Sequence, residues 1–130
     1  MPKYVLPQDE LQRASNWISN FLMREGYHLD YTIESLLEID KFLKEKINLV
    51  LQNDNNRNLI FSISAYIGEV FIMKFNGHWE VSHTIDLDDE TVAISFKNYD
   101  TIYPLNIIVE LMQKKYTMRE FLKNSFHIEV

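Results

Sequence analysis

Residues 65–82, "AYIGEVFIMKFNGHWEVS", decide how this chain folds, and they pose one question. Most of these residues are apolar, yet Gly68 and Glu69 stand side by side in the middle. A glycine in a helix interior costs about 1 kcal/mol relative to alanine, and a buried carboxylate costs more unless it has a partner. We interpret Gly68 as a contact point between helices and Glu69 as a hydrogen-bonded structural carboxylate. The indole N–H of Trp79 is one candidate donor.

Two other roles for Glu69 stay open from the sequence alone. The carboxylate could bind a ligand or take part in catalysis, or it could be exposed and have no special role. Burial would raise the pKa of Glu69 and donated hydrogen bonds would lower it. The sequence does not decide which effect is larger.

The apolar residues that precede Gly68 fit two structures. The run "LIFSISAY" alternates as a strand does and contains β-branched residues, so 58–75 could form a hairpin around "YIGE". The helical alternative places Ser62, Ala65 and Gly68 on one stripe, where small side chains allow close approach of a neighbour. A helix that is apolar almost all round must be buried. We favour the buried helix.

Hydrophobic periodicity predicts helices on both sides of this stretch. An α+β fold follows, with N-terminal helices, a small antiparallel sheet of two or three strands and C-terminal helices. The expected elements are helices at about Gln8–Glu25 and Ile33–Val50, a polar connection at 52–58, strands at 78–83 and 91–97, a short third strand in 98–104, a helix from Pro104 through Met112, and a last short helix after Thr117.

Several residues mark where these helices begin. Pro104 suits the first turn of a helix. Thr117 and Glu120 have the spacing of a capping box. Ser35 and Glu38 have the same spacing, although Thr32 is an alternative cap for that helix.

Composition indicates a single globular domain covering residues 1–130. The 46% hydrophobic fraction supplies a core, and three glycines with three prolines leave little linker. There are no cysteines, and the N-terminal residues lack the apolar core of a signal peptide. Polar residues such as Glu69 and Lys74 interrupt the longest apolar segment, which disfavours a membrane span. We expect a cytoplasmic protein without a membrane association.

Negative charge is concentrated in residues 84–100. Five carboxylates there stand against Lys97 alone, within a net charge of −6. Nucleic-acid binding requires clustered cations, so we expect no nucleic acid and instead a basic protein partner. The predicted binding residues combine these acids with two aromatic side chains: Asp86, Asp88, Asp89, Glu90, Asp100, Trp79 and Tyr99. The alternative, which we favour for the aromatic residues, is that they pack into the core of a small sheet.

No motif predicts a metal, a cofactor or a catalytic group. His78 and His83 are five residues apart, which places them on opposite faces of a strand. The acidic run 86–90 lacks the glycine and glutamate of a calcium-binding EF-hand loop. No serine lies in a nucleophile elbow, and the glycines are too scattered to hold a phosphate.

The order of these features resembles a group of small, uncharacterised bacterial domains of unknown function. Their pattern is a helix with Tyr-x-Gly-Glu, then Gly-x-Trp opening a strand, then an aromatic-Pro pair that begins a helix. The resemblance covers about residues 30–125 and includes the run "SLLEIDKFL" at 35–43. It implies the helical form of 58–75, and some similar small acidic proteins neutralise partner toxins. The matching residues are Ala65, Tyr66, Gly68, Glu69, Gly77, Trp79, Tyr103 and Pro104.

Three functional hypotheses follow from the sequence. The first is a non-enzymatic protein-binding module with an acidic face, in the form of an immunity-type inhibitor of a basic partner. The second is a structural module that forms a homo-dimer or larger homo-oligomer without a ligand. The third is a hydrolase-type enzyme that uses Glu69 with a histidine. The lack of a catalytic motif favours a non-enzymatic role.

Overall fold

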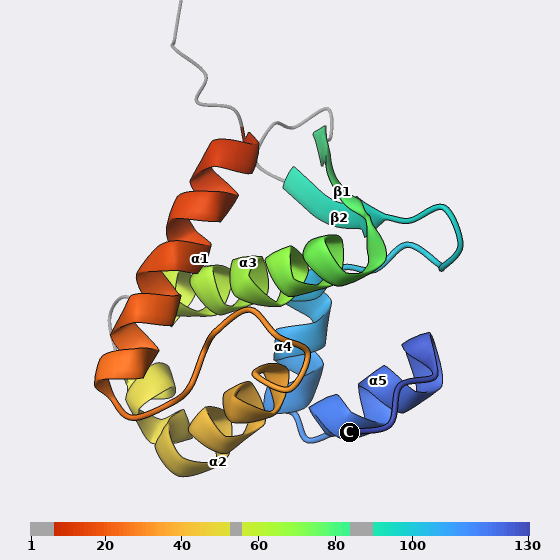
Figure 1. Ribbon diagram of the computed structural model, residues 1–130. Helices are drawn as coiled ribbons and strands as arrows, with labels where there is room; N and C mark the ends of the chain where they lie inside the picture. The colour runs from red at the N-terminus through yellow and green to blue at the C-terminus, as the bar shows by residue number, and fades with distance from the viewer. Residues whose placement is uncertain (1–6, 53–55, 84–89) are drawn as a thin grey trace, which may run out of the picture.

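The structure is a computed structural model that describes residues 7–52, 56–83 and 90–130, and it has the expected α+β layout. Within those ranges, five helices are combined with a two-stranded antiparallel sheet, which lies at one edge of the molecule (Figure 1). The elements are α1 (Pro7–Arg24), α2 (Leu36–Gln52), α3 (Asn56–Phe75), β1 (His78–His83), β2 (Glu90–Ser95), α4 (Pro104–Met112) and α5 (Met118–Phe126).

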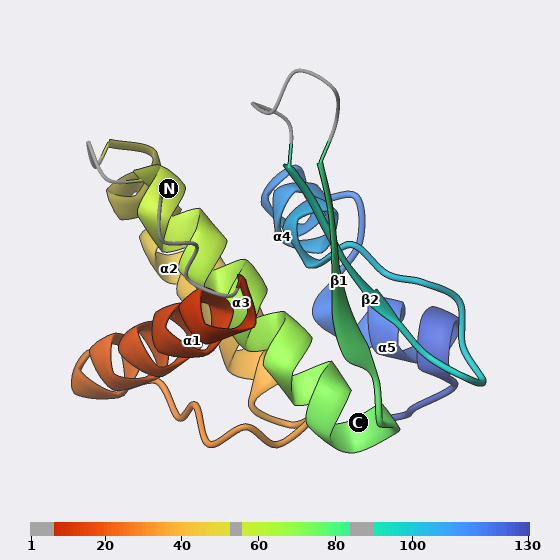
Figure 2. The same cartoon turned by 90° about the horizontal axis from the view of Figure 1, so that it is seen from above.

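Helix α3 is the central element of the fold. Figures 1 and 2 show it between α1 on one side and the β1–β2 hairpin with α4 on the other. It is buried along most of its length, including Ser62, Ala65 and Gly68. The helical prediction for 58–75 is therefore confirmed over the hairpin alternative. A helix that is enclosed on several sides has no polar face. Its sequence therefore lacks the amphipathic pattern that would distinguish a helix from a strand.

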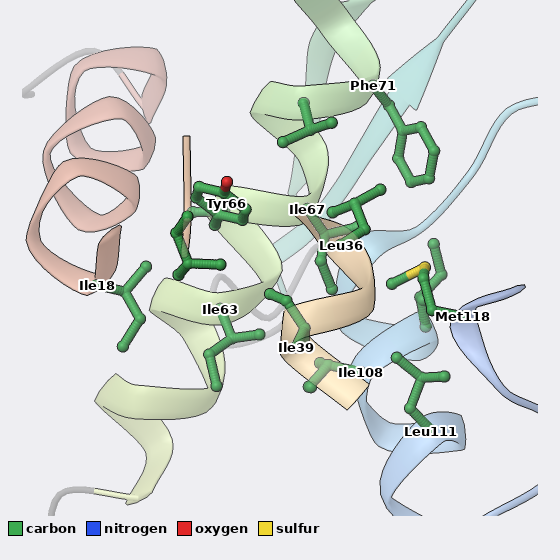
Figure 3. Close-up of a cluster of buried hydrophobic side chains, with 14 of the residues drawn as sticks. Ile18, Leu36, Ile39, Ile63, Tyr66, Ile67, Phe71, Ile108, Leu111 and Met118 are labelled. Atoms are coloured by element: carbon green, nitrogen blue, oxygen red, sulfur yellow. The ribbon is translucent and has the colours of Figure 1, made fainter. Parts of the chain in front are cut away.

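The hydrophobic core is built on α3 and reaches all four other helices (Figure 3). Fully burying one large aliphatic or aromatic side chain stabilises the fold by about 1.5–3 kcal/mol. The labelled core residues are Ile18 of α1; Leu36 and Ile39 of α2; Ile63, Tyr66, Ile67 and Phe71 of α3; Ile108 and Leu111 of α4; and Met118 of α5.

The sheet holds two strands in the described chain. Trp79 pairs with Ile94 across β1 and β2, and His78 pairs with Ser95. The third strand expected in 98–104 is reduced to one bridge, in which the backbones of Ile94 and Ile102 exchange hydrogen bonds of 2.9 and 3.0 Å. Pro104 follows within two residues and starts α4, because proline suits a first helical turn.

The predicted capping box is confirmed where α5 begins, whereas the Ser35–Glu38 box predicted for α2 is wrong. The Thr117 side chain accepts from the Glu120 backbone, and the Glu120 side chain accepts in return from Thr117. Ahead of α2, the Thr32 hydroxyl accepts from the Ser35 N–H at 3.2 Å, so Thr32 caps the turns that lead into the helix. Glu38 accepts from the backbone of His28 instead and forms no box with Ser35.

Several element boundaries differ from the predictions by one to three residues. Helix α3 begins at Asn56, inside the stretch 52–58 that was expected to be a connection. The polar residues 56–58 form the first turn of α3, and its apolar residues start at Leu59. Helix α2 begins at Leu36 instead of Ile33, because i→i+3 turns occupy the residues before it. A non-helical backbone conformation at Lys46 also interrupts α2.

One segment of the described chain, Asn58–Phe75 in α3, is long and apolar enough to cross a membrane by length and composition. More than half of this segment is buried inside the protein. The core helix of a soluble protein has the same properties. The cytoplasmic location stays a prediction.

Candidate functional site

The Gly68–Glu69 pair is explained by Trp79. An added Cβ at Gly68 would lie 2.1 Å from Cη2 and 2.5 Å from Cζ2 of the Trp79 ring. The indole N–H donates to Oε1 of Glu69 at 3.2 Å, which confirms the predicted donor. Burial raises the pKa of Glu69, and the hydrogen bond from Trp79 opposes that shift. The expected contact between helices is wrong in one respect, because Gly68 meets a side chain of the sheet.

Tyr66 ties α3 to the segment before α2. Its hydroxyl accepts from the Tyr31 backbone N–H at 2.8 Å and lies 2.6 Å from the Ser35 hydroxyl. Tyr66 is fully buried, and burial is the main cause that raises its pKa to about 12. Its phenol is therefore a neutral structural group within the core.

The remaining motif residues also have structural explanations. A Cβ on Gly77 would meet the Phe96 ring at 2.6 Å and Ile94 at 2.8 Å, so only glycine fits this turn into β1. Pro104 is buried at the start of α4. Gly68, Glu69, Gly77, Trp79 and Pro104 of the motif therefore describe how α3, the hairpin and the start of α4 are arranged.

The structure describes the side chains of three of the seven predicted binding residues, Trp79, Tyr99 and Asp100. Asp86, Asp88, Asp89 and the side chain of Glu90 lie outside the described residues. Trp79 is buried in the core and joins α3 to β1. Tyr99 and Asp100, by contrast, are exposed and adjacent. The structure thus separates Trp79 from the two exposed members of the set.

Aromatic packing accounts for the side of Tyr99 that faces the protein. Its ring lies 5.1 Å from Phe75 and 5.1 Å from Phe126 between centroids, with Phe96 at 6.1 Å. The Phe75 and Phe126 rings stack at 4.4 Å. The core alternative for the aromatic residues therefore holds for Phe96 and for one side of Tyr99.

Next to this aromatic packing lies a hollow of about 610 Å³, which we call the α4–α5 hollow. Residues 100–103, one face of α4 and one face of α5 form its walls. Spacing explains the α4 face, since Tyr103, Asn106 and Glu110 are three and four residues apart. The lining residues are Asp100, Thr101, Ile102, Tyr103, Asn106, Ile107, Glu110, Tyr116, Phe121, Asn124, Ser125, Phe126 and His127.

The α4–α5 hollow is anionic. Asp100 and Glu110 line it, and within the described chain it has neither lysine nor arginine in its walls. Burial, together with a hydrogen bond to Glu110, raises the pKa of Tyr116, so this phenol stays neutral. Tyr103 at the rim is 43% exposed. Two carboxylates that line one hollow, together with an accessible aromatic ring, suit a cationic side chain.

Sequence reasoning named Asp100 and missed most of the other residues of this hollow. Tyr116 and His127 are far from Asp100 in sequence, and the docking of α5 brings them to the same hollow as Asp100. The i, i+4 pair of Asn106 and Glu110 was the one available signal. His127 ends α5 in a left-handed conformation, with φ 58°.

Of the two histidines in β1, His78 is the one whose side chain the structure describes. His78 is exposed and lies 2.8 Å from the Ser95 hydroxyl and 3.7 Å from the Glu80 carboxylate. Among the residues that the structure describes, no three His, Cys, Asp or Glu side chains come close enough to hold a metal ion.

Comparisons with known proteins add no family to this description. No protein-family model matches the chain, and no curated protein or solved structure matches it significantly. The resemblance to uncharacterised bacterial domains therefore stays a prediction.

Proposed function

We propose that the protein is a non-enzymatic binding module that holds a basic protein partner at the α4–α5 hollow. The observation that supports this proposal is the charge of the hollow, whose volume is about 610 Å³. Its acidic lining residues are Asp100 and Glu110, and the described walls contain no Lys or Arg. Charges of one sign in a concave surface attract and orient a partner of opposite sign. The net charge of −6 acts in the same direction.

The chemistry of the rim supports a protruding lysine or arginine as the group that enters. Tyr103 offers an exposed ring face for a cation–π contact, and Asn106 and Asn124 offer amide oxygens. Buried Phe126 and Ile107 give the hollow an apolar wall. An aromatic anchor surrounded by polar groups is typical of the sites that dominate protein interfaces.

A neighbouring hollow of about 470 Å³ makes a useful contrast. Lys44, Lys114 and Lys115 line it together with two carboxylates, Asp40 and Glu120. Its mixed charge gives no preference for a basic partner. The acidic character therefore belongs to the α4–α5 hollow and is not common to every concave surface of the protein.

An immunity-type inhibitor that neutralises a basic toxin is the form of this function to which the sequence resemblance points. The hydrolase alternative has less support, because the walls around Glu69 that the structure describes contain no histidine. The indole of Trp79 also engages one oxygen of that carboxylate.

An affinity pull-down from native lysate, repeated at low and high salt, tests the proposal. We compare the wild type with Asp100→Asn/Glu110→Gln and with Glu10→Gln/Glu34→Gln, a control that removes two exposed charges elsewhere. We expect a basic partner that is retained at low salt, weakened by salt and lost only in the first variant. Equal retention by both variants would overturn the proposal, and so would the capture of no basic partner at either salt.

One observation favours the homo-oligomer as a second candidate. Leu105 and Val109 are exposed one turn apart on α4, with Met112 partly buried one turn further on. Such an apolar stripe suits a second copy of the helix. Multi-angle light scattering of the wild type and of Leu105→Lys/Val109→Lys tests this idea. A wild-type monomer at high protein concentration would rule it out.

A further inference from the structure

A second hollow lies between α1 and α3, and we call it the Glu69 hollow. Its volume is about 280 Å³, and it shares no lining residue with the α4–α5 hollow. Each helix contributes residues from one face to its walls. Glu69 and Met73 are one turn apart on α3, and Gln12, Ser15 and Asn16 lie on one face of α1. The lining residues are Gln12, Ser15, Asn16, Tyr31, Glu69 and Met73.

Tyr31 stands at this hollow in a strained backbone conformation. Its φ of 66° lies in the left-handed region, which bulky side chains rarely adopt. Such strain costs on the order of 1–3 kcal/mol and persists only where surrounding contacts hold it. Here the contacts are the Tyr31 N–H donated to Tyr66 and ring packing on Tyr66, with centroids 4.8 Å apart.

The Tyr31 hydroxyl is held equally firmly. It donates to Oδ1 of Asn16 at 2.6 Å and lies 2.9 Å from the hydroxyl of buried Ser15. A phenol has one proton to donate, and the Tyr31 phenol donates it in the hydrogen bond to Asn16. Ser15 must therefore be the donor in the second hydrogen bond. This network fixes the wall of the hollow before any ligand arrives.

Glu69 is fixed as well, and its charge lacks a basic partner in the walls. The indole of Trp79 donates to Oε1, whereas a carboxylate can accept about four hydrogen bonds. The described walls of this hollow contain carboxylate, amide, hydroxyl and thioether groups but no lysine or arginine. A half-buried carboxylate in this setting gains from a cation that replaces lost water.

We propose that the Glu69 hollow binds a small alkylammonium ion. The ammonium group lies against the Glu69 carboxylate and donates to amide oxygens of Gln12 or Asn16. Its aliphatic stem packs on Met73, which is 66% exposed and flexible.

The volume agrees with a ligand of this size. Sites for drug-sized molecules are typically about 300–1,000 Å³, and this hollow is slightly smaller. This site is separate from the proposed partner surface, so either assignment can fail without the other.

Tryptophan fluorescence gives a direct measurement of occupancy. The chain has two tryptophans, and Trp17 is 51% exposed on α1. In a Trp17→Phe background, emission reports Trp79 alone, whose N–H contacts Glu69. We titrate n-butylammonium chloride through the millimolar range, with sodium chloride and 1-butanol as controls for ionic strength and for the apolar stem. We expect a saturable response to butylammonium only.

Three variants identify the group that binds. Glu69→Gln keeps an acceptor for the indole and removes the charge, and we expect about tenfold weaker binding, the effect of losing about 1.4 kcal/mol. Glu80→Gln removes an exposed charge beside Trp79 and should bind as the wild type does. Asp100→Asn/Glu110→Gln should also bind normally, which separates this site from the α4–α5 hollow.

Nuclear magnetic resonance covers the case in which emission does not change on binding. The Trp79 indole N–H and the Asn16 side-chain amide should shift with the same saturation curve. The proposal is overturned if neither method detects saturable binding. Equal affinities for wild type and Glu69→Gln, or equal losses in Glu69→Gln and Glu80→Gln, would overturn it too.

Discussion

The Trp79 ring occupies the space where a side chain on Gly68 would be. A Cβ built there comes within 2.1 Å of the ring, and the δ-methyl of Ile94 is 2.9 Å away. Both neighbours come from the β1–β2 hairpin, so Gly68 sets how closely the sheet approaches α3. The hydrogen bond from Trp79 to Glu69 then fixes the ring in that position.

This contact predicts that Gly68→Ala destabilises the protein. Alanine in a helix interior ordinarily gains about 1 kcal/mol over glycine, but here the added methyl must displace a packed indole. Overpacking of this kind costs about 1–3 kcal/mol or more. Urea denaturation gives the change in the free energy of unfolding.

Three further variants, Asn20→Ala, Trp79→Leu and the double variant Gly68→Ala/Trp79→Leu, test the cause of that loss. Asn20→Ala changes an exposed position of α1 and should leave stability within about 0.5 kcal/mol of the wild type. Gly68→Ala/Trp79→Leu removes the ring that blocks the methyl, so its loss should be smaller than the sum of the two single losses. Strict additivity would show that the clash with Trp79 is not the cause.

The sequence predicted the elements around this contact well because the physics there is local. Pro104 at a first turn and Thr117 with Glu120 in a capping box act within a few residues, and each is confirmed. The partner of Gly68 was harder, because a glycine does not reveal which element approaches it. The predicted contact between helices was therefore wrong, whereas the hydrogen bond between Glu69 and Trp79 was confirmed.

Tyr66→Phe should destabilise the protein although it removes only one oxygen. The buried hydroxyl accepts from the backbone N–H of Tyr31 and bonds the Ser35 hydroxyl. An unpaired buried polar group costs about 1–3 kcal/mol, and the lost acceptor leaves Tyr31 in its strained conformation. Urea denaturation measures the effect, and Tyr103→Phe at an exposed site is the matched control. A Tyr66→Phe variant as stable as the control would contradict this role of the network.

The candidate binding surface shows the limit of sequence reasoning. Asp100 was predicted from the acidic run, but Tyr116 and His127 join it only because α5 docks beside α4. Docking depends on contacts between residues far apart in the chain. One such contact is the hydrogen bond from the Met118 N–H to Asp40, 78 residues away, at 2.7 Å.

That hydrogen bond predicts how α5 is held. Asp40→Ala removes an acceptor from the first residue of α5 and should cost about 1–2 kcal/mol. Asp40→Asn keeps an oxygen acceptor and should cost less. Hydrogen exchange of the α5 amides gives the local effect, and faster exchange in α5 than in α3 is expected for Asp40→Ala. Unchanged α5 exchange in that variant would mean that the core contacts of Met118 and Leu122 suffice.

The raised pKa of Glu69 predicts the pH dependence of its contribution to stability. Burial makes the folded state hold the Glu69 proton more tightly than the unfolded state does. Stability must then fall as pH rises from the ordinary glutamate pKa through the folded value, and become constant above it. Glu69→Gln lacks this titration and keeps an acceptor for Trp79, so its stability relative to wild type should increase across the same window.

Urea denaturation of both proteins at a series of pH values between about 3 and 7, a range that brackets the ordinary glutamate pKa, measures this difference. Asp40, whose pKa burial also raises, is present in both proteins, so its titration cancels in the difference curve. A curve that slopes the opposite way would mean that the Trp79 hydrogen bond outweighs burial and that the folded pKa is lowered. In that case Glu69 would stabilise the folded protein most at neutral pH, as an ionised acceptor for the indole.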